Sequence, residues 1–350
     1  MIGRNWCQID LGAIKRNYLN CKEGLLSGQK IMAVVKANAY GHGGVQVAKA
    51  LQDVGCNSFA VASVAEGVEL RRSGVKGQIL VLGYTPPSEF FALCDFDLSQ
   101  TVFSREYALA LKVGCGRVKA HIAIDTGMNR IGFDCGDIDF INDCANWLCI
   151  EGVYTHFAVA DDENNGFTNF QIKRFKKVLS GLSFGLQSVH CANSKGFQNF
   201  NGDYANTVRL GACLYGLGGC DRVEPALTWK SVVVASKEIS AGESIGYGRV
   251  FVAKNNMKIA TIACGYADGY SRGLSNLGHV VINGEVAPVV GRVCMDMMMV
   301  DISEVGQVSL GDEAVLLGEK YSAKDMASAL NTIDYEVVTR ISSRVERVYI

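Results

Sequence analysis

The residue of this sequence best suited to covalent chemistry is a lysine at the start of a glycine-containing stretch. Lys36 follows a short apolar run at residues 31–35, and Gly41 and Gly43 come before a segment with helical spacing. This order predicts a lysine at the end of a buried strand, followed by a loop and a helix. Burial favours the neutral amine, which can form a Schiff base with an aldehyde. A strand-end lysine that reaches solvent is the alternative.

Length and composition bound the remaining possibilities. The chain has 350 residues, of which 49% are hydrophobic and 20% charged, with a net charge of −1. This is a globular composition, and the length suits two domains. The near-zero charge argues against nucleic acid or an anionic membrane as a partner. No apolar run reaches the roughly 18 residues of a membrane-spanning helix, and no apolar signal core is visible, so we expect a cytoplasmic protein.

The 13 cysteines and five histidines form no recognisable ligand motif. Because no two cysteines have the CxxC spacing, we expect neither a disulfide scaffold nor a zinc cage, and we interpret most cysteines as small buried hydrophobic residues. The histidines are scattered, without an HxH or HxxxH pair. We therefore expect no metal site.

Apolar runs recur through the first two thirds of the chain, at residues 31–35, 58–62, 78–82, 97–103, 117–124, 150–155, 187–191 and 207–214. Helical or loop segments separate them, and strands that alternate with helices indicate a parallel sheet. Eight such units favour an α/β fold closed into a (β/α)8, TIM-type barrel, although an open doubly wound sheet has the same local pattern. We expect the barrel over residues 9–222.

Beyond Pro225 the pattern changes to short strand-like runs, many of them separated by turns such as Asn283-Gly284. This pattern is typical of a mainly β domain. We expect it over residues 223–350, joined by a strand at residues 1–8.

The expected barrel would gather polar side chains at one mouth, because the active sites of such barrels lie at the carboxyl ends of the strands. Polar or charged residues follow the ends of several apolar runs, namely Lys36, Asp125, His156 and Ser194, and Arg209 lies near the start of the eighth run.

Several motifs follow one another along the chain: VVKANAYGHG, DTGMNRIG, THFA, CANS, VRLGACLYG, GYADGY, GRVCMD and TIDYE. In this order they resemble the alanine racemases, a family of fold-type III pyridoxal-phosphate enzymes. The resemblance implies pyridoxal 5'-phosphate as cofactor, alanine as substrate, and a homodimer whose active sites are shared between subunits. It also implies a role in supplying D-alanine for peptidoglycan.

The resemblance implies the catalytic residues. Lys36 would hold the cofactor as an aldimine and act as acid and base on one face of the substrate α-carbon. Tyr266, contributed by the partner subunit, would act on the opposite face. Arg209 would face the pyridine nitrogen and keep it unprotonated, and His156 would lie beside the ring.

The binding residues come from the same resemblance. The cofactor phosphate would be bound by Tyr40, Ser194, Gly211, Ala212 and Tyr335. The carboxylate side of the substrate would contact Arg130 and Met295, with Asp296 behind them, and Asp161 and Arg292 would line the entry corridor.

The chain departs from the family at one position. Many members carry a lysine two residues before the aspartate of DTGM, and its carbamate holds the arginine of the motif. This chain has Ala123 there, so Arg130 must be oriented by something else.

Three alternatives stay open at this level: a racemase of broader specificity, a fold-type III amino-acid decarboxylase, and a non-catalytic pyridoxal-phosphate-binding protein. Tyr266 favours proton transfer, because decarboxylases of this fold place a cysteine-containing loop there. The binding proteins are single barrels, which residues 225–350 argue against. The sequence does not separate alanine from serine as substrate.

Overall fold

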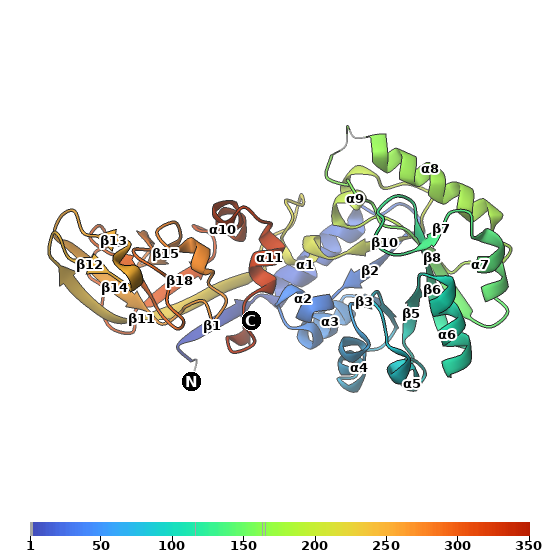
Figure 1. Cartoon of the computed structure of the whole chain (residues 1–350), viewed down its shortest axis with the longest axis horizontal. Helices are drawn as coiled ribbons and strands as arrows, with labels where there is room; N and C mark the ends of the chain where they lie inside the picture. The colour runs from blue at the N-terminus through green and yellow to red at the C-terminus, as the bar shows by residue number, and fades with distance from the viewer. Residues whose placement is uncertain (1–2, 116, 163, 165) are drawn as a thin grey trace. The chain divides into compact units, whose positions relative to one another are not determined.

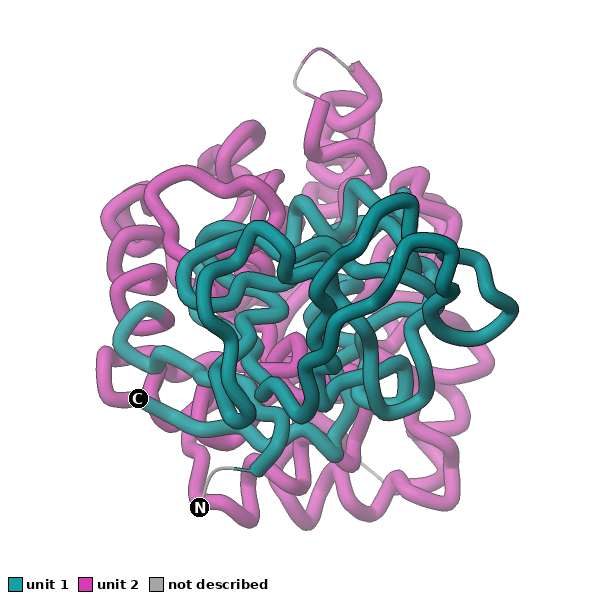
Figure 2. The backbone as a smooth tube through the Cα atoms, turned by 90° about the vertical axis from the view of Figure 1, so that its left-hand side faces the viewer, with its two compact units in different colours: residues 1–13, 225–350 teal, residues 14–224 magenta. Residues whose placement is uncertain are grey.

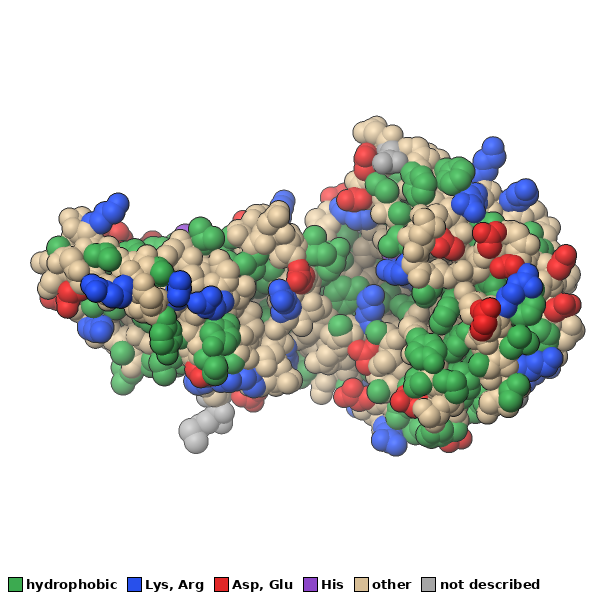
Figure 3. All heavy atoms as spheres, viewed as in Figure 1, with side chains coloured by type: hydrophobic (Ala, Val, Ile, Leu, Met, Phe, Trp, Pro, Cys, Tyr) green, Lys and Arg blue, Asp and Glu red, His purple; other side chains and the backbone are tan. Residues whose placement is uncertain are grey.

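The computed structural model describes residues 3–115, 117–162, 164 and 166–350 (Figure 1). Two compact units make up the chain (Figure 2): the residues up to Ala13 with Pro225–Ile350, and Ile14–Glu224. On the face drawn in Figure 3, positive and negative side chains are interspersed, in keeping with the net charge of −1. Across the described residues, no helix has the length and apolar composition needed to cross a membrane.

A closed barrel of parallel strands forms the core of the unit Ile14–Glu224. Its strands are β2 (Lys30–Val34), β3 (Ser58–Val61), β4 (Gln78–Val81), β5 (Ser99–Val102), β6 (Lys119–Asp125), β8 (Cys149–Tyr154), β9 (Ser188–His190) and β10 (Thr207–Leu210). Each pairs in parallel with the next, and β10 pairs with β2 to complete the ring. The predicted barrel is therefore confirmed, and the open doubly wound sheet is excluded.

Helices surround this barrel (Figure 1). They are α3 (Gly44–Asp53), α4 (Val64–Arg72), α5 (Phe90–Asp95), α6 (Arg105–Cys115), α7 (Ile138–Cys144), α8 (Gly166–Gly181) and α9 (Ser194–Asn199), with the short elements α2 (Lys36–Tyr40), η1 (Pro87–Glu89), β7 (Phe133–Asp134) and η2 (Ala212–Tyr215). Helix α1 (Leu11–Glu23) precedes the first barrel strand. The residues that follow the carboxyl end of each strand lie at the same mouth of the barrel.

The interior of the barrel is apolar on one side and polar on the other. Met32, Ala60 and Leu80 belong to one buried apolar cluster supplied by β2, β3 and β4. Across from these strands in the pairing order, β6 and β9 bury His121 and His190. Because successive strand residues alternate between the two faces of the sheet, the strand register decides which side chains enter the interior.

The second unit is mainly β, as predicted. Its strands are β1 (Asn5–Ile9), β11 (Leu227–Ile239), β12 (Ser244–Ile245), β13 (Phe251–Val252), β14 (Met257–Ile262), β15 (His279–Ile282), β16 (Glu285–Pro288), β17 (Met298–Asp301), β18 (Glu313–Leu317) and β19 (Glu346–Tyr349). The helical elements are η3 (Tyr247–Arg249), η4 (Arg272–Leu274), α10 (Ala323–Leu330) and α11 (Asp334–Thr339). The N-terminal strand β1 lies between β11 and β19.

The long strand β11 connects the two parts of this unit's sheet. Its first half pairs with β1 and β18, and its second half pairs with β14. The register shifts between Val233 and Ala235, where the strand changes partner. Such an irregularity bends a strand and increases its twist.

Cys213 and Cys220 form a disulfide, with their Cα atoms 5.5 Å apart. No pair spacing in the sequence indicated it. Among the described residues it is a single cross-link within one loop rather than a scaffold. Other cysteines, such as Cys7, Cys56 and Cys191, are free and buried, as expected for small hydrophobic residues.

The substitution Met32→Ala should lower the free energy of unfolding by about 2–5 kcal/mol, because it removes a fully buried side chain from the barrel interior. Denaturant titration of the full chain measures the change. Val113→Ala is the control, since this α6 side chain is 89% exposed, and it should change the free energy by less than about 0.5 kcal/mol. Equal effects of the two substitutions would contradict the described core.

Candidate active site

Lys36 begins a left-handed turn just beyond the carboxyl end of β2. The strand ends at Val34, and the residues that follow Lys36 have positive φ: 53° at Ala37, 53° at Asn38, 53° at Ala39 and 54° at Tyr40. Left-handed backbone costs about 1–2 kcal/mol at each residue that carries a Cβ. The sequence predicted an ordinary loop here, and no glycine at these positions indicated the left-handed path.

The amine of Lys36 is half-buried and makes no hydrogen bond or ion pair with a described residue. Burial is the main cause that lowers its pKa, and the positive charges of Arg130 and Arg209 lower the pKa further. The carboxylate of Glu66 acts in the opposite direction. A lysine in these surroundings is a better nucleophile near neutral pH than an exposed lysine.

Arg209 lies in β10 and points its guanidinium into the barrel, where the residue is only 4% exposed. Its Nη1 donates to Nδ1 of His190 at 2.8 Å, and its Nη2 lies 3.1 Å from Nδ1 of His156. Nη2 also donates to the carbonyls of Thr155 and Cys191. No carboxylate of the described chain pairs with this guanidinium, so its N–H groups have neutral acceptors but its positive charge has no counter-ion.

The histidines around Arg209 are neutral, and their tautomers follow from the guanidinium. Because a guanidinium only donates, Nδ1 of both His156 and His190 must accept, and each proton lies on Nε2. Nε2 of His190 lies 2.7 Å from Nδ1 of His121, whose Nε2 lies 3.0 Å from the amide nitrogen of Gln78. Burial, reinforced by the charge of Arg209, lowers the pKa of His121 and of His156 to about 3 and holds the pKa of His190 well below its usual range.

A second group of predicted residues meets beside the first. The hydroxyl of Ser194, at the start of α9, accepts from the backbone N–H groups of Gly211 and Cys213 at 3.1 and 3.3 Å. A Cβ at Gly211 would come within 2.5 Å of the hydroxyl of Tyr40, so glycine is required for this close approach. Ala212 begins η2 between these N–H groups. Two hydroxyls and a turn of N–H groups are suited to a phosphate.

Arg130 lies on the loop after β6 with its side chain exposed. It makes no hydrogen bond or ion pair with any described residue, and the buried Ala123 offers none. The carboxylate of Asp125 instead accepts from the N–H groups of Gly127 and Asn129, at 2.8 and 3.1 Å. The guanidinium is therefore available to an anion.

Tyr266 and Met295 lie on adjacent loops of the mainly β unit. The N–H of Tyr266 donates to the carbonyl of Cys294 at 3.0 Å, and the N–H of Ala267 donates to that of Met295 at 2.9 Å. The side chains of Tyr266 and Met295 are 42% and 53% exposed. Tyr335 lies in α11 of the same unit and is partly exposed.

A buried carboxylate fixes the Tyr266 loop. Asp268 is 1% exposed and accepts from the N–H of Gly265 at 2.9 Å. Its other oxygen pairs with Arg4 at 3.1 Å and with Arg344 at 2.9 Å. Arg344 also pairs with Asp296, the neighbour of Met295, at 2.7 Å. This network connects both loops to the two ends of the chain.

The structure therefore gathers the predicted residues into groups. At the barrel mouth, burial and the positive charges of Arg209, Arg130 and Lys36 lower the pKa of His156. The second group, Tyr40, Ser194, Gly211 and Ala212, meets beside them. The sequence did not reveal Glu66, His121, His190 or the Asp268 network. The alternation of inward positions along β6 and β9 could have indicated the two histidines.

Two family models match the chain. The model described as the N-terminal domain of alanine racemase matches residues 9–218, and the model described as the C-terminal domain matches residues 226–349. An alanine racemase of Halothermothrix orenii is 43% identical over 98% of this chain and 96% of its own length. The relatives thus share both units.

Solved structures of alanine racemases are also similar to this chain over its whole length. The structure of alanine racemase from Clostridium difficile 630 has a TM-score of 0.95 at 37% identity, over 100% of this chain and 96% of that chain. The crystal structure of alanine racemase from Bartonella henselae with covalently bound pyridoxal phosphate has a TM-score of 0.92 at 30% identity, over 99% of this chain and 100% of that chain.

Lowering the pH from about 7 to 5 should destabilise the fold. The unfolded histidines titrate near pH 6.5, whereas folded His121 and His156 have pKa values of about 3. The unfolded state therefore binds more protons in this window, and each such histidine contributes up to about 1.4 kcal/mol per pH unit. Denaturation at several pH values measures this slope. It should be shallower in His121→Gln, and an unchanged slope would contradict the neutral histidines.

Proposed function

The chain belongs to the alanine racemase family, and on that premise we propose how its own residues perform the reaction. Lys36 and Tyr266 of the partner subunit exchange the α-hydrogen of alanine on its two faces, with pyridoxal phosphate bound to Lys36. The observation that carries this proposal is the cationic group of Lys36, Arg130 and Arg209 at the barrel mouth, for which the described residues provide no acidic side chain within hydrogen-bonding distance.

The residues present fit pyridoxal phosphate at both of its ends. Arg209 has a fixed guanidinium without a carboxylate partner, and it would face the pyridine nitrogen. Ser194, Gly211, Ala212 and Tyr40 offer the hydroxyls and N–H groups that a phosphate requires, and Tyr335 would complete this set. The relative from Bartonella henselae is described with covalently bound pyridoxal phosphate.

The chain's own groups would then divide the work. When bound, the cofactor acidifies the substrate α-hydrogen by withdrawing electrons into its ring. Arg209 remains protonated, so it keeps the ring nitrogen unprotonated and limits this withdrawal. Once the substrate amine has replaced Lys36 on the cofactor, Lys36 would be a free neutral amine that takes or returns the proton on one face. Tyr266 does the same on the opposite face.

Binding and orientation fall to other groups. The exposed guanidinium of Arg130 is suited to the substrate carboxylate. Met295, next to the Tyr266 loop, would contact the substrate from the partner subunit. His156 donates from Nε2, because its Nδ1 already accepts from Arg209, and in this proposal it would hold the hydroxyl of Tyr266 of the partner subunit. We further propose that the D-alanine formed supplies peptidoglycan synthesis in the cytoplasm.

The protein with pyridoxal phosphate should remove the optical activity of L-alanine at least about tenfold faster than that of L-serine, L-lysine or L-arginine, since a factor of ten needs only about 1.4 kcal/mol of discrimination. Polarimetry with each amino acid separately measures these rates. Comparable rates with the basic amino acids would replace this proposal with a broad-specificity racemase. Bound cofactor without any racemisation would contradict it altogether.

Mixing two inactive variants should restore activity if each active site is shared between subunits. Lys36→Ala and Tyr266→Phe each remove one of the two proposed bases. After random re-association, about half of the dimers carry one of each variant, and one of their two sites is intact, so activity should return to about a quarter of the wild-type value. The double variant mixed with itself is the control. Confirmed mixed dimers without activity would place both groups in one subunit.

A further inference from the structure

We propose that Glu66 is the positioning residue of the Lys36 turn: its carboxylate accepts from the N–H groups of Ala37 and Ala62 and thereby holds the left-handed backbone that aims Lys36. This inference rests on the proposed function of Lys36, since it concerns how that amine is presented. Glu66 itself touches neither substrate nor cofactor in this proposal and acts through the turn.

Each of the two carboxylate oxygens of Glu66 accepts a hydrogen bond from a different backbone N–H. Oε1 accepts from the N–H of Ala37 at 2.7 Å, and Oε2 accepts from the N–H of Ala62 at 2.7 Å. Ala37 directly follows Lys36, and Ala62 directly follows β3. One carboxylate therefore joins the ends of β2 and β3 at the barrel mouth. Hydrogen bonds to a charged acceptor are about twice as strong as those between neutral groups.

The location of Glu66 in its own helix supports a special role. Ser63 is the N-cap of α4, and its hydroxyl accepts from the N–H of Glu66 at 3.3 Å. A glutamate at this third helical position commonly reaches back to the N–H of the cap residue. Here it extends past Ser63 to Ala62 and across to Ala37. The usual hydrogen bond to the cap residue is thus replaced by a hydrogen bond to Ala37, beyond the end of the neighbouring strand β2.

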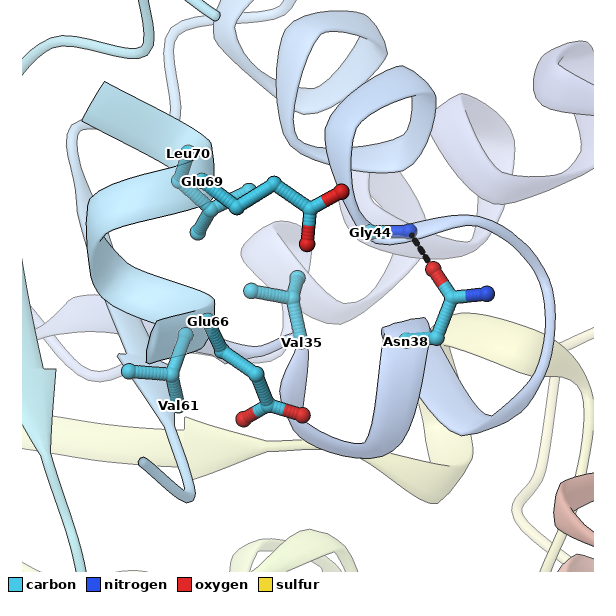
Figure 4. A pocket seen from close by; sticks show the side chains of 7 residues that line it. All are labelled: Val35, Asn38, Gly44, Val61, Glu66, Glu69 and Leu70. Atoms are coloured by element: carbon cyan, nitrogen blue, oxygen red, sulfur yellow. Dashed lines mark hydrogen bonds between the residues drawn. The ribbon is translucent and has the colours of Figure 1, made fainter. Parts of the chain in front are cut away.

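The turn needs such a contact because its backbone is strained. Ala37, Asn38, Ala39 and Tyr40 all have positive φ, and conformations of this kind persist only where surrounding contacts enforce them. At the far end of the turn, the side-chain oxygen of Asn38 accepts from the N–H of Gly44 at 2.7 Å (Figure 4). At the near end, Glu66 is the side chain that accepts from the turn.

The structure offers a matched residue for comparison. Glu69 lies one turn further along α4, and it lines the same cavity of about 280 Å³ as Glu66 and Asn38 (Figure 4). It carries the same charge but makes no side-chain hydrogen bond or ion pair with a described residue. Replacement of either glutamate by glutamine removes one negative charge beside the turn, and only the change at Glu66 places an amide N–H against a backbone N–H.

The experiment compares Glu66→Gln with Glu69→Gln in the full chain. Hydrogen–deuterium exchange of residues 37–41 should become at least tenfold faster in Glu66→Gln and stay within twofold in Glu69→Gln, with β17 as the internal reference. Pyridoxal phosphate added to cofactor-stripped protein, followed by borohydride trapping and mass spectrometry, should label Lys36 at least fivefold more slowly in Glu66→Gln alone. Equal behaviour of the two variants would overturn the proposal.

A second variant keeps the test decisive if Glu66→Gln lowers the overall stability. Glycine adopts positive φ without the cost that alanine has. In the Glu66→Gln background, Ala37→Gly should therefore recover at least half of the lost labelling rate. A general loss of folding would not be repaired at this exposed position, so the absence of any recovery would contradict the role of strain.

The labelling of Lys36 and the hydrogen–deuterium exchange of the turn test the proposed function and this proposal separately. If the wild-type chain takes no label at Lys36, the proposed cofactor attachment is wrong. The exchange rates of residues 37–41 still decide whether Glu66 holds the turn. Normal labelling in the wild type together with unchanged exchange in Glu66→Gln would retain the function and overturn the positioning role.

Discussion

The guanidinium of Arg209 is held inside the barrel without a carboxylate beside it, and much of the site follows from that constraint. A charge removed from water must be compensated by hydrogen bonds or by a counter-ion. The neutral acceptors are two histidine nitrogens and two backbone carbonyls. They satisfy the N–H groups but leave the net charge in place. Lys36 and Arg130 add to it, so the barrel mouth is a positive region prepared for an anionic ligand, as phosphate and carboxylate groups are.

The fixed charge also sets the state of its neighbours. Histidines that accept from a guanidinium cannot become protonated without losing that hydrogen bond, and burial opposes their charge as well. His156 and His190 are therefore held as neutral rings with the proton on Nε2. The strand register makes this possible, because it turns Arg209, His190 and His121 toward the same side of the interior. The apolar cluster of β2 to β4 occupies the other side.

The sequence predicted the parts of this arrangement that depend on local pattern. Apolar periodicity located all the barrel strands, and motif order located Lys36, His156 and Arg209 at their ends. The left-handed turn after Lys36 escaped prediction, because Ala37 and Ala39 have no preference for positive φ and only distant contacts enforce it. The Asp268 network escaped for the same reason, whereas the Cys213–Cys220 bridge joins residues only seven positions apart and has no recognisable pair spacing. Pairing between residues far apart in the chain depends on tertiary structure, which local propensity does not encode.

Three of the candidate side chains, Lys36, Arg130 and Tyr266, share one structural feature. Each lies next to a backbone N–H that donates to a carboxylate: Glu66 accepts from the N–H after Lys36, Asp125 from the N–H before Arg130, and Asp268 from the N–H before Tyr266. The acids thus stabilise irregular backbone, which would otherwise lose its hydrogen bonds on folding. Had they paired directly with Lys36 or Arg130, those cations would be neutralised and their protons held. Because the carboxylates accept from backbone N–H groups, they hold the backbone beside Lys36, Arg130 and Tyr266 without pairing with those side chains. The side chains therefore have a fixed backbone and a functional group without an ion-pair partner, which is the combination that acid–base chemistry requires.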